Sequence, residues 1–191
     1  MRIGMVLQAR IPPPDIRVEK EAQTLIGQGH EVHLLLERGP GEAVEETAVG
    51  VLYRRGVMMG PLRRKWRRYT FSFTFRDPIW RRAIRSFAEQ RHIEVLHVHD
   101  LPLVREVAGV GRSLGIPVVA DLHENYPAGL QVWYRKRFKK RTIYNYQRWA
   151  RYEREILPRL FCRNMKRYLW MSRMGMLRSF SMLLLRLSVS R

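Results

Sequence analysis

The sequence predicts an α/β fold in which helices flank a parallel β-sheet. Short apolar runs of strand length alternate along the chain with longer segments that have helical apolar spacing. The connections between them are short, which is typical of strand–helix–strand units in parallel sheets. The clearest unit is Glu94–Pro127, which is expected to form a strand, a helix and a second strand.

The predicted strands are short apolar segments bounded by polar or glycine-containing stretches. The run at 49–57 is expected toward an edge of the sheet, and the acidic, glycine-containing stretch at 39–46 is expected to be a loop. In chain order the strands are expected at residues 2–7, 31–36, 49–57, 95–98 and 116–120.

The first predicted helix begins near Arg17, after a loop in which Pro12–Pro14 exclude regular structure. Asp15 is its expected N-cap, and Gly27 and Gly29 are expected to end it. Its apolar residues recur at i, i+4, i+7 and i+8, as one face of a helix requires. These residues are Val18, Ala22, Leu25 and Ile26.

Three further helical segments are expected. Asp77 and Pro78 form a helix start, and this helix is expected to end near Gln90. Another helix lies between the last two strands, and a long basic helix or helix pair is expected from Trp133 to Leu157. The basic, aromatic stretch at 61–76 is interpreted as an insertion with no assigned element.

The net charge is strongly positive, with 36 Lys and Arg against 17 Asp and Glu, or +19 at pH 7. This balance predicts an anionic partner such as nucleic acid, acidic lipid headgroups or phosphorylated substrates. The single cysteine, Cys162, excludes an internal disulfide and favours a reducing compartment. The first residues resemble a strand and not a signal peptide, and no run approaches the roughly 18 apolar residues of a membrane span.

The composition changes after Glu155. All 17 acidic residues lie at or before this position, and residues 156–191 contain basic, apolar and hydroxyl side chains instead. Residues 1–157 are therefore expected to form one domain. Residues 158–191 are expected to form an atypical basic tail, helical or disordered, that does not continue this domain.

Polar residues follow the last two predicted strands at the point where each strand ends. His99 and Asp100 end the first, and Asp121, His123 and Glu124 follow the second. Ligands of open parallel sheets bind in the crevice at the carboxyl ends of the strands. These residues are therefore predicted to line a site.

The histidines His97, His99 and His123 allow three interpretations. A zinc site needs three or four convergent ligands, and the third is uncertain here, so a metal site is the least favoured. Hydrogen-bonded polar residues at strand ends are favoured over a metal site. The most favoured interpretation is a His and acid pair that lines a sugar or phosphate pocket. We therefore expect no metal.

Glycines 109, 111 and 115 are similar to a dinucleotide-binding fingerprint. The gap before the last glycine is one residue too long for the fingerprint. The glycines also precede a predicted strand, whereas the fingerprint must follow a strand. We therefore interpret them as the end of a helix.

Two clusters interleave basic and aromatic residues, at 63–69 and 133–141. A solvated charged face is the default interpretation. On a nucleic-acid surface, the arginines would bind phosphates and the aromatic rings would stack on bases. On a membrane surface, the arginines would bind acidic lipids and the aromatic rings would lie at the interface. The chain has no zinc-finger, helix-turn-helix or RNA-recognition signature, which disfavours nucleic acid.

Three segments together carry a family resemblance. They are D-I-R-V-E-K-E-A at 15–22, V-L-H-V-H-D at 95–100 and I-P-V-V-A-D-L-H-E-N-Y-P at 116–127. In this order and spacing they resemble the N-terminal half of a family 4 (group 1) glycosyltransferase of the GT-B fold. The resemblance covers residues 1–157 and implies a Rossmann-like N-terminal domain that binds the acceptor.

The resemblance implies a retaining enzyme that moves a sugar from a nucleotide sugar to a lipid-linked or saccharide acceptor without a metal. His123 matches the histidine that reaches the donor sugar, and is the expected catalytic residue. Arg17, His99, Asp100 and Glu124 match the acceptor side of the cleft. Because family acceptors are often membrane-borne, the resemblance implies an anionic membrane surface as partner and a location at the cytoplasmic, inner face of the cell membrane.

The chain departs from the family pattern because no donor-binding domain and no E-x7-E glutamate pair follow. This chain is therefore expected to bind no cofactor itself. One hypothesis is a truncated, inactive transferase whose tail arises from a frameshift. A second is the membrane-docking acceptor subunit of a split transferase, with the donor-binding domain in a separate chain. A third is a basic nucleic-acid-binding module.

Overall fold

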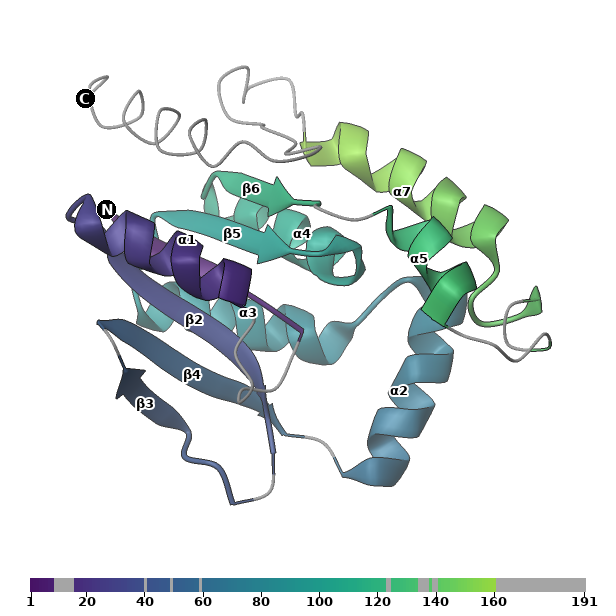
Figure 1. Ribbon diagram of the computed structural model, residues 1–191, viewed down its shortest axis with the longest axis horizontal. Coiled ribbons are helices and arrows are strands. Elements are labelled where there is room, and N and C mark those ends of the chain that lie inside the picture. The colour runs from purple at the N-terminus through teal and green to yellow at the C-terminus, as the bar shows by residue number, and fades with distance from the viewer. Residues whose placement is uncertain are drawn as a thin grey trace.

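The computed structural model describes residues 1–8, 16–39, 41–48, 50–58, 60–122, 125–133, 138 and 141–160. This part of the chain is a Rossmann-like α/β structure, with a sheet between helices (Figure 1). The predicted fold class is confirmed. Most of the predicted tail, from residue 161 onward, lies outside the described residues, as does the predicted N-cap Asp15.

The sheet has six strands in the order β3-β4-β2-β1-β5-β6. The five strands from β4 to β6 are parallel neighbours, and β3 pairs antiparallel with β4 at one edge. The strands are β1 (Arg2–Val6), β2 (Glu31–Arg38), β3 (Glu45–Ala48), β4 (Val51–Met58), β5 (Val95–His99) and β6 (Val118–Asp121).

The structure corrects the prediction for residues 39–46, which do not form a loop throughout. Glu45–Ala48 is strand β3, and β4 lies just inside it, toward the edge as predicted. The turn between the two strands includes Gly50 at φ +78°, a conformation that glycine adopts readily. The segment EETA lacks the apolar alternation of a strand. It is a strand because it pairs with β4.

Seven helical segments are described. Those that the sequence predicted include α3, where the Asp77 side chain accepts a hydrogen bond from Trp80 N at 3.1 Å. They also include α4, which ends at Gly115 in the left-handed conformation with φ +70°, so the three glycines do mark a helix end. The segments are α1 (Ile16–Gly27), α2 (Pro61–Thr74), α3 (Pro78–Gln90), the 3-10 turn η1 (Leu101–Leu103), α4 (Val104–Leu114), α5 (Tyr126–Trp133) and α7 (Tyr146–Leu160).

One helical prediction needs correction. The stretch at 61–76 contains helix α2, which begins with Pro61 at the first helical position, where proline's fixed φ fits and its missing N–H is not needed. In the helix or helix pair predicted from Trp133 to Leu157, the described residues Phe138 and Arg141 are helical, and α7 covers the second part.

Each face of the sheet carries an apolar core. Because successive side chains of a strand point to opposite faces, Leu34 and Leu36 pack with α1, whereas Leu35 packs on the other side. That other core is the larger, and it joins the sheet to α3, α4 and α7 through fully buried residues such as Trp80 and Phe87. Figure 1 shows α1 on one face of the sheet and α3 and α4 on the other.

Two glycines of α4 provide a matched test of this packing. A Cβ at Gly111 would meet Val118 and lie 2.8 Å from the backbone oxygen of Ile116, whereas a Cβ at Gly109 would lie 3.5 Å from the Arg81 guanidinium. We predict that Gly111→Ala lowers the free energy of unfolding by about 1–3 kcal/mol through overpacking. Gly109→Ala should raise it by about 0.5–1 kcal/mol, since alanine favours a helix. Urea denaturation measures both, and equal effects would contradict the close approach of α4 to β6.

Candidate functional site

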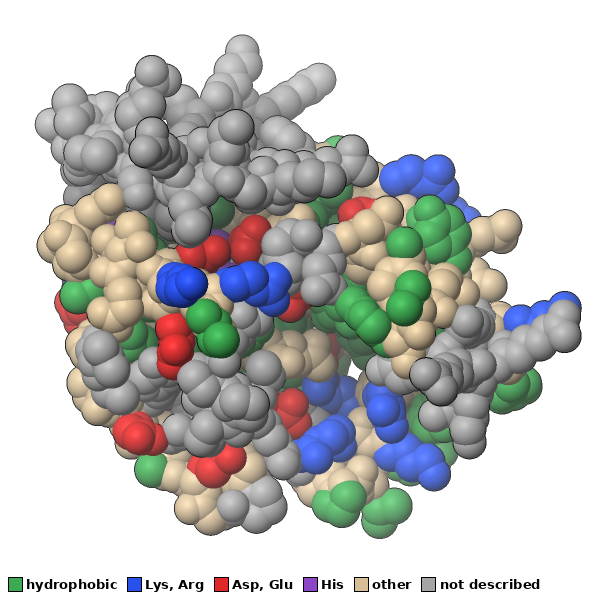
Figure 2. Space-filling model, in the orientation of Figure 1, with side chains coloured by type: hydrophobic (Ala, Val, Ile, Leu, Met, Phe, Trp, Pro, Cys, Tyr) green, Lys and Arg blue, Asp and Glu red, His purple; other side chains and the backbone are tan. Residues whose placement is uncertain are grey.

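A cavity of about 550 Å³ opens at the carboxyl edge of the sheet. Gln8 after β1, Glu37 in β2 and Asp100 after β5 form its sheet side, and α2 forms the opposite wall. This is the edge at which open parallel sheets bind ligands. Figure 2 shows the molecule hollowed beside α2, with Lys and Arg side chains on the α2 side.

The α2 wall of the cavity is basic. Arg64 donates to Glu37 at 3.0 Å, and Arg67 pairs with Asp77, so two of these cations are held by carboxylates. Lys65 and Arg68 also line the cavity and are exposed. The wall therefore presents positive charge to whatever enters.

The wall opposite the sheet also carries aromatic rings. Trp149 lies with its ring centroid 5.0 Å from that of Tyr126 and 6.0 Å from that of Phe71. Its Nε1 donates to the Ile143 carbonyl at 3.1 Å, which fixes the indole orientation. Together with Tyr144, these rings line the cavity. Trp149, Tyr144 and Phe71 are buried, so Tyr126 is the ring of this group with a partly exposed face on which a sugar ring can pack.

Asp100 is the predicted site residue that the structure places at this cavity. It connects β5 to η1 with φ +66°, a conformation that costs a non-glycine residue about 1–3 kcal/mol. Its backbone N–H donates to the Asp121 carbonyl at 3.0 Å, which holds the strained residue at the sheet edge. A carboxylate in this place accepts hydrogen bonds from ligand hydroxyl groups.

Two of the other predicted site residues, His99 and Arg17, lie away from this cavity. His99 is buried on the α1 face, with Nδ1 3.9 Å from Glu21 Oε2 and 3.8 Å from Asp121 Oδ2, and it is not among the described residues that line the cavity. Arg17 is exposed in the first turn of α1. His123 and Glu124 lie outside the described residues.

A compact group of ligand atoms surrounds the two buried histidines. Glu21, His97 and His99 each offer one ligand atom within 4.8 Å of the others, and the two imidazole centroids lie 4.2 Å apart. Two imidazoles and one carboxylate are a donor set that divalent metals accept. Burial lowers the pKa of His97 well below its ordinary value, the neighbouring His99 lowers it further, and Asp121 opposes the shift. His97 is therefore neutral at pH 7.

The lowered pKa of His97 predicts a pH dependence of stability. Below the ordinary value of 6.5 the unfolded chain binds a proton that the folded chain excludes, so stability is present above pH 6.5 and is lost as the pH falls. One such group contributes a slope of up to about 1.4 kcal/mol per pH unit. Urea denaturation from pH 7.5 to 5 measures it. His97→Gln should flatten the slope, the exposed His92→Asn should not, and an unchanged slope in His97→Gln would contradict the assignment.

A buried polar network lies behind the cavity. The sequence predicted only its helix cap at Asp77, and not the rest of the network. Asp77, only 1% exposed, accepts from Trp80 N, pairs with Arg67 of α2 and donates its own N–H to Glu106 of α4 at 2.8 Å. Burial raises the pKa of Glu106 from its ordinary value, and this hydrogen bond opposes the rise. The Asp-Pro dipeptide signals the cap, but no local pattern signals partners in α2 and α4.

Removal of the Asp77 carboxylate should therefore be costly. Asp77→Ala leaves Arg67 without its buried counter-charge, and we predict a loss of about 3–5 kcal/mol in unfolding free energy. Glu89→Ala breaks the exposed Arg85–Glu89 pair at 3.0 Å and should change stability by less than about 1 kcal/mol. Thermal or urea denaturation compares the two, and similar small losses would show that Asp77 does not hold α2.

The fold and the cavity define a class of protein: a Rossmann-like domain with a ligand cleft at the carboxyl edge of a parallel sheet. The family model of Glycosyltransferase Family 4 matches residues 16–174. The chain therefore belongs to Glycosyltransferase Family 4, as the resemblance implied. The match extends past residue 157, into the segment predicted to be a tail.

Solved structures share the fold of this chain. Sucrose-phosphate synthase from Thermosynechococcus elongatus, a GT-B glycosyltransferase, matches with a TM-score of 0.56 at 14% identity over 92% of this chain. This chain covers 48% of that enzyme, so it spans about half its length. A second structure of that synthase matches with a TM-score of 0.52 at 9% identity over 99% of this chain and 97% of the other. At these identities the likeness establishes the fold alone, and no curated protein matches the chain.

Proposed function

We propose that this chain is the acceptor-binding half of a retaining glycosyltransferase, which transfers a sugar from a nucleotide sugar to a lipid-linked or saccharide acceptor. The observation that carries the proposal is the cavity at the carboxyl edge of the sheet, with a basic wall and an aromatic wall. Transfer then requires a donor-binding half that faces this cavity, in the same polypeptide or in a partner chain. The described half alone would be inactive.

The cavity walls suit the two parts of such an acceptor. Lys65 and Arg68 suit an acceptor phosphate, and the partly exposed ring of Tyr126 suits the apolar face of a sugar. The Asp100 carboxylate would orient the acceptor hydroxyl. The hydroxyl oxygen would bond to the anomeric carbon as the bond from that carbon to the nucleoside diphosphate breaks, and the leaving phosphate oxygen would take up the hydroxyl proton. His123 would polarise the donor sugar. The proposed chemistry uses no metal.

Helix α2 also supports the proposed anionic membrane surface at the inner face of the cell membrane. Leu62, Trp66 and Phe73 are 75%, 70% and 61% exposed, and their spacing places them along one side of the helix. Arg63 and Lys65 are exposed beside them. Exposed aromatic and basic groups on one helix are typical of interfacial binding, and Figure 2 shows both kinds of side chain over α2. Among the described helices, none is long and apolar enough to cross a bilayer.

Sedimentation with vesicles tests the membrane proposal. The chain should bind phosphatidylglycerol vesicles more tightly than phosphatidylcholine vesicles, and Arg63→Ala should weaken binding about fivefold, since each basic residue near an anionic surface contributes about 1 kcal/mol. Trp66→Ala should weaken it as well. Arg82→Ala, at an exposed position of α3, is the control that should bind as wild type. Tight, steeply salt-dependent RNA or DNA binding without vesicle binding would favour the nucleic-acid module instead.

A substitution at His123 tests the proposed catalysis. In a chain supplied with a donor-binding half, His123→Ala should abolish transfer of labelled sugar and leave the thermal unfolding midpoint unchanged. Wild-type turnover in this variant would remove His123 from the site. Co-purification of the chain with a nucleotide-sugar-binding protein would favour the split enzyme over a single polypeptide.

A further inference from the structure

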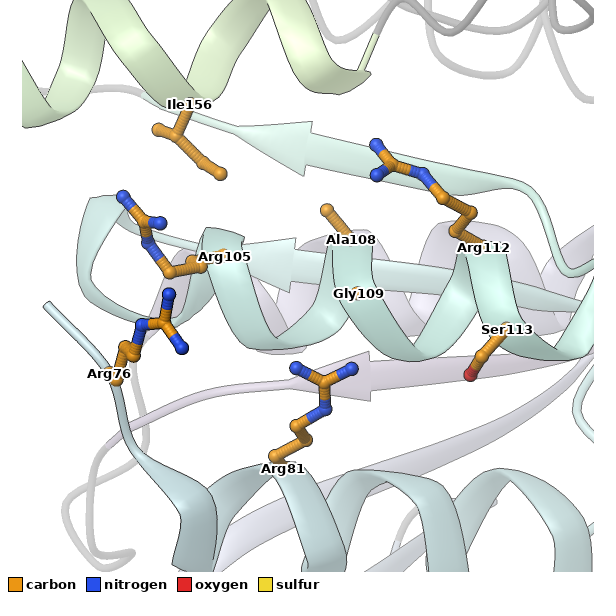
Figure 3. A pocket seen from close by; sticks show the side chains of 8 residues that line it. All are labelled: Arg76, Arg81, Arg105, Ala108, Gly109, Arg112, Ser113 and Ile156. Carbon is orange, nitrogen blue, oxygen red and sulfur yellow. The ribbon is translucent and has the colours of Figure 1, made fainter.

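A second pocket, separate from the cavity at the sheet edge, lies among α3, α4 and α7. Its volume is about 360 Å³, and it shares no lining residue with that cavity. Four of the described residues that line it are arginines: Arg76, Arg81, Arg105 and Arg112. Figure 3 shows Arg76, Arg81 and Arg105 around one end of this pocket and Arg112 at the other. We call it the arginine pocket.

The sequence of α4 creates the hollow between these cations. Arg105 and Arg112 are two helical turns apart on one face, a separation of about 10 Å along the axis. Ala108 and Gly109 lie between them and form a floor without bulky side chains. Arg81 of α3 faces this floor, because its guanidinium lies 3.5 Å from where a Gly109 Cβ would be.

The described lining of the arginine pocket is basic. Among the described residues that line it, none is acidic. Glu106 lies on the same helix but is buried, and its carboxylate accepts from the Asp77 backbone N–H and attracts Arg81 and Arg105 from behind the pocket. This one carboxylate offsets part of the positive charge, and a cavity lined by four guanidinium groups still attracts an anion.

One of the arginines is held in place before any ligand binds. The Arg105 guanidinium lies 5.1 Å from the ring centroid of Tyr152, which is buried in α7. Burial raises the pKa of the Tyr152 phenol to about 12, and Arg105 opposes the rise, so the ring partner stays neutral at physiological pH. A guanidinium that is already oriented loses less entropy when it binds an anion.

We propose that the arginine pocket is a binding site for a phosphate or diphosphate group, either of a soluble metabolite or of a lipid headgroup. Guanidinium forks bind phosphate oxygens in pairs, and the separation of Arg105 from Arg112 suits two linked phosphates. The site lies outside the proposed acceptor cleft, so this proposal does not depend on the proposed function.

The test is isothermal titration of the full chain with inorganic pyrophosphate at low ionic strength. Saturable binding is expected, and Arg81→Gln and Arg112→Gln should each weaken it about tenfold through the loss of charge-assisted hydrogen bonds. Both side chains are exposed, so the fold should survive, which circular dichroism checks. Arg82→Gln, one position along α3 and not a lining residue, should bind as wild type.

Vesicles of phosphatidic acid separate the two sources of phosphate. A headgroup site predicts that Arg81→Gln also weakens vesicle binding, whereas a site for soluble phosphate predicts that it does not. The proposal is overturned if the wild-type chain binds neither pyrophosphate nor vesicles through Arg81. It is also overturned if Arg82→Gln weakens pyrophosphate binding as much as Arg81→Gln, since general positive charge would then explain the binding.

Discussion

The buried Asp77 carboxylate connects the helices on which the cleft depends. This carboxylate caps α3 at Trp80 N and pairs with Arg67 of α2, while the backbone N–H of Asp77 donates to Glu106 of α4. A buried carboxylate without partners would be strongly unfavourable, so the three helices can pack only where these contacts form. Helix α2, which carries the basic wall of the cleft, is thereby fixed relative to the sheet.

The sheet presents different chemistry on its two faces near the same edge. On the α1 face, His97, His99 and Glu21 form a buried polar group. On the other face, Asp100 and the α2 and α7 side chains form the open cleft. The alternation of side chains along β5 produces this division, because His97 and His99 point one way while Val98 points into the larger core.

The parallel sheet and the cap at Asp77 could be predicted from sequence because their signals are local. Apolar runs, glycine-terminated helices and an Asp-Pro helix start each depend on neighbouring residues. Strand β3 could not be predicted, since only its pairing with β4 makes it a strand. Asp100 was predicted at the site because it directly follows a strand. The basic cluster at 63–69 was recognised, but it was not assigned to this site because the stretch was interpreted as an insertion with no assigned element.

The same limit applies to the arginine pocket. Arg76, Arg81, Arg105 and Arg112 are dispersed among the 36 Lys and Arg of the chain, and nothing in their local sequence distinguishes them. Packing of α3 against α4 brings them together. A strong net charge thus predicts an anionic partner, but tertiary structure determines which cations share a cavity.

We propose that the cleft at the carboxyl edge of the sheet binds the acceptor. Steady-state kinetics of Asp100→Asn can be measured in the chain supplied with a donor-binding half and assayed on extracted membrane lipid. Asparagine has the same shape as aspartate, so the backbone should be retained at the positive φ of this position. Loss of the carboxylate should raise the KM for the acceptor and leave the KM for the nucleotide sugar unchanged. If the acceptor KM is unchanged, or if only the KM for the nucleotide sugar changes, this cleft does not bind the acceptor.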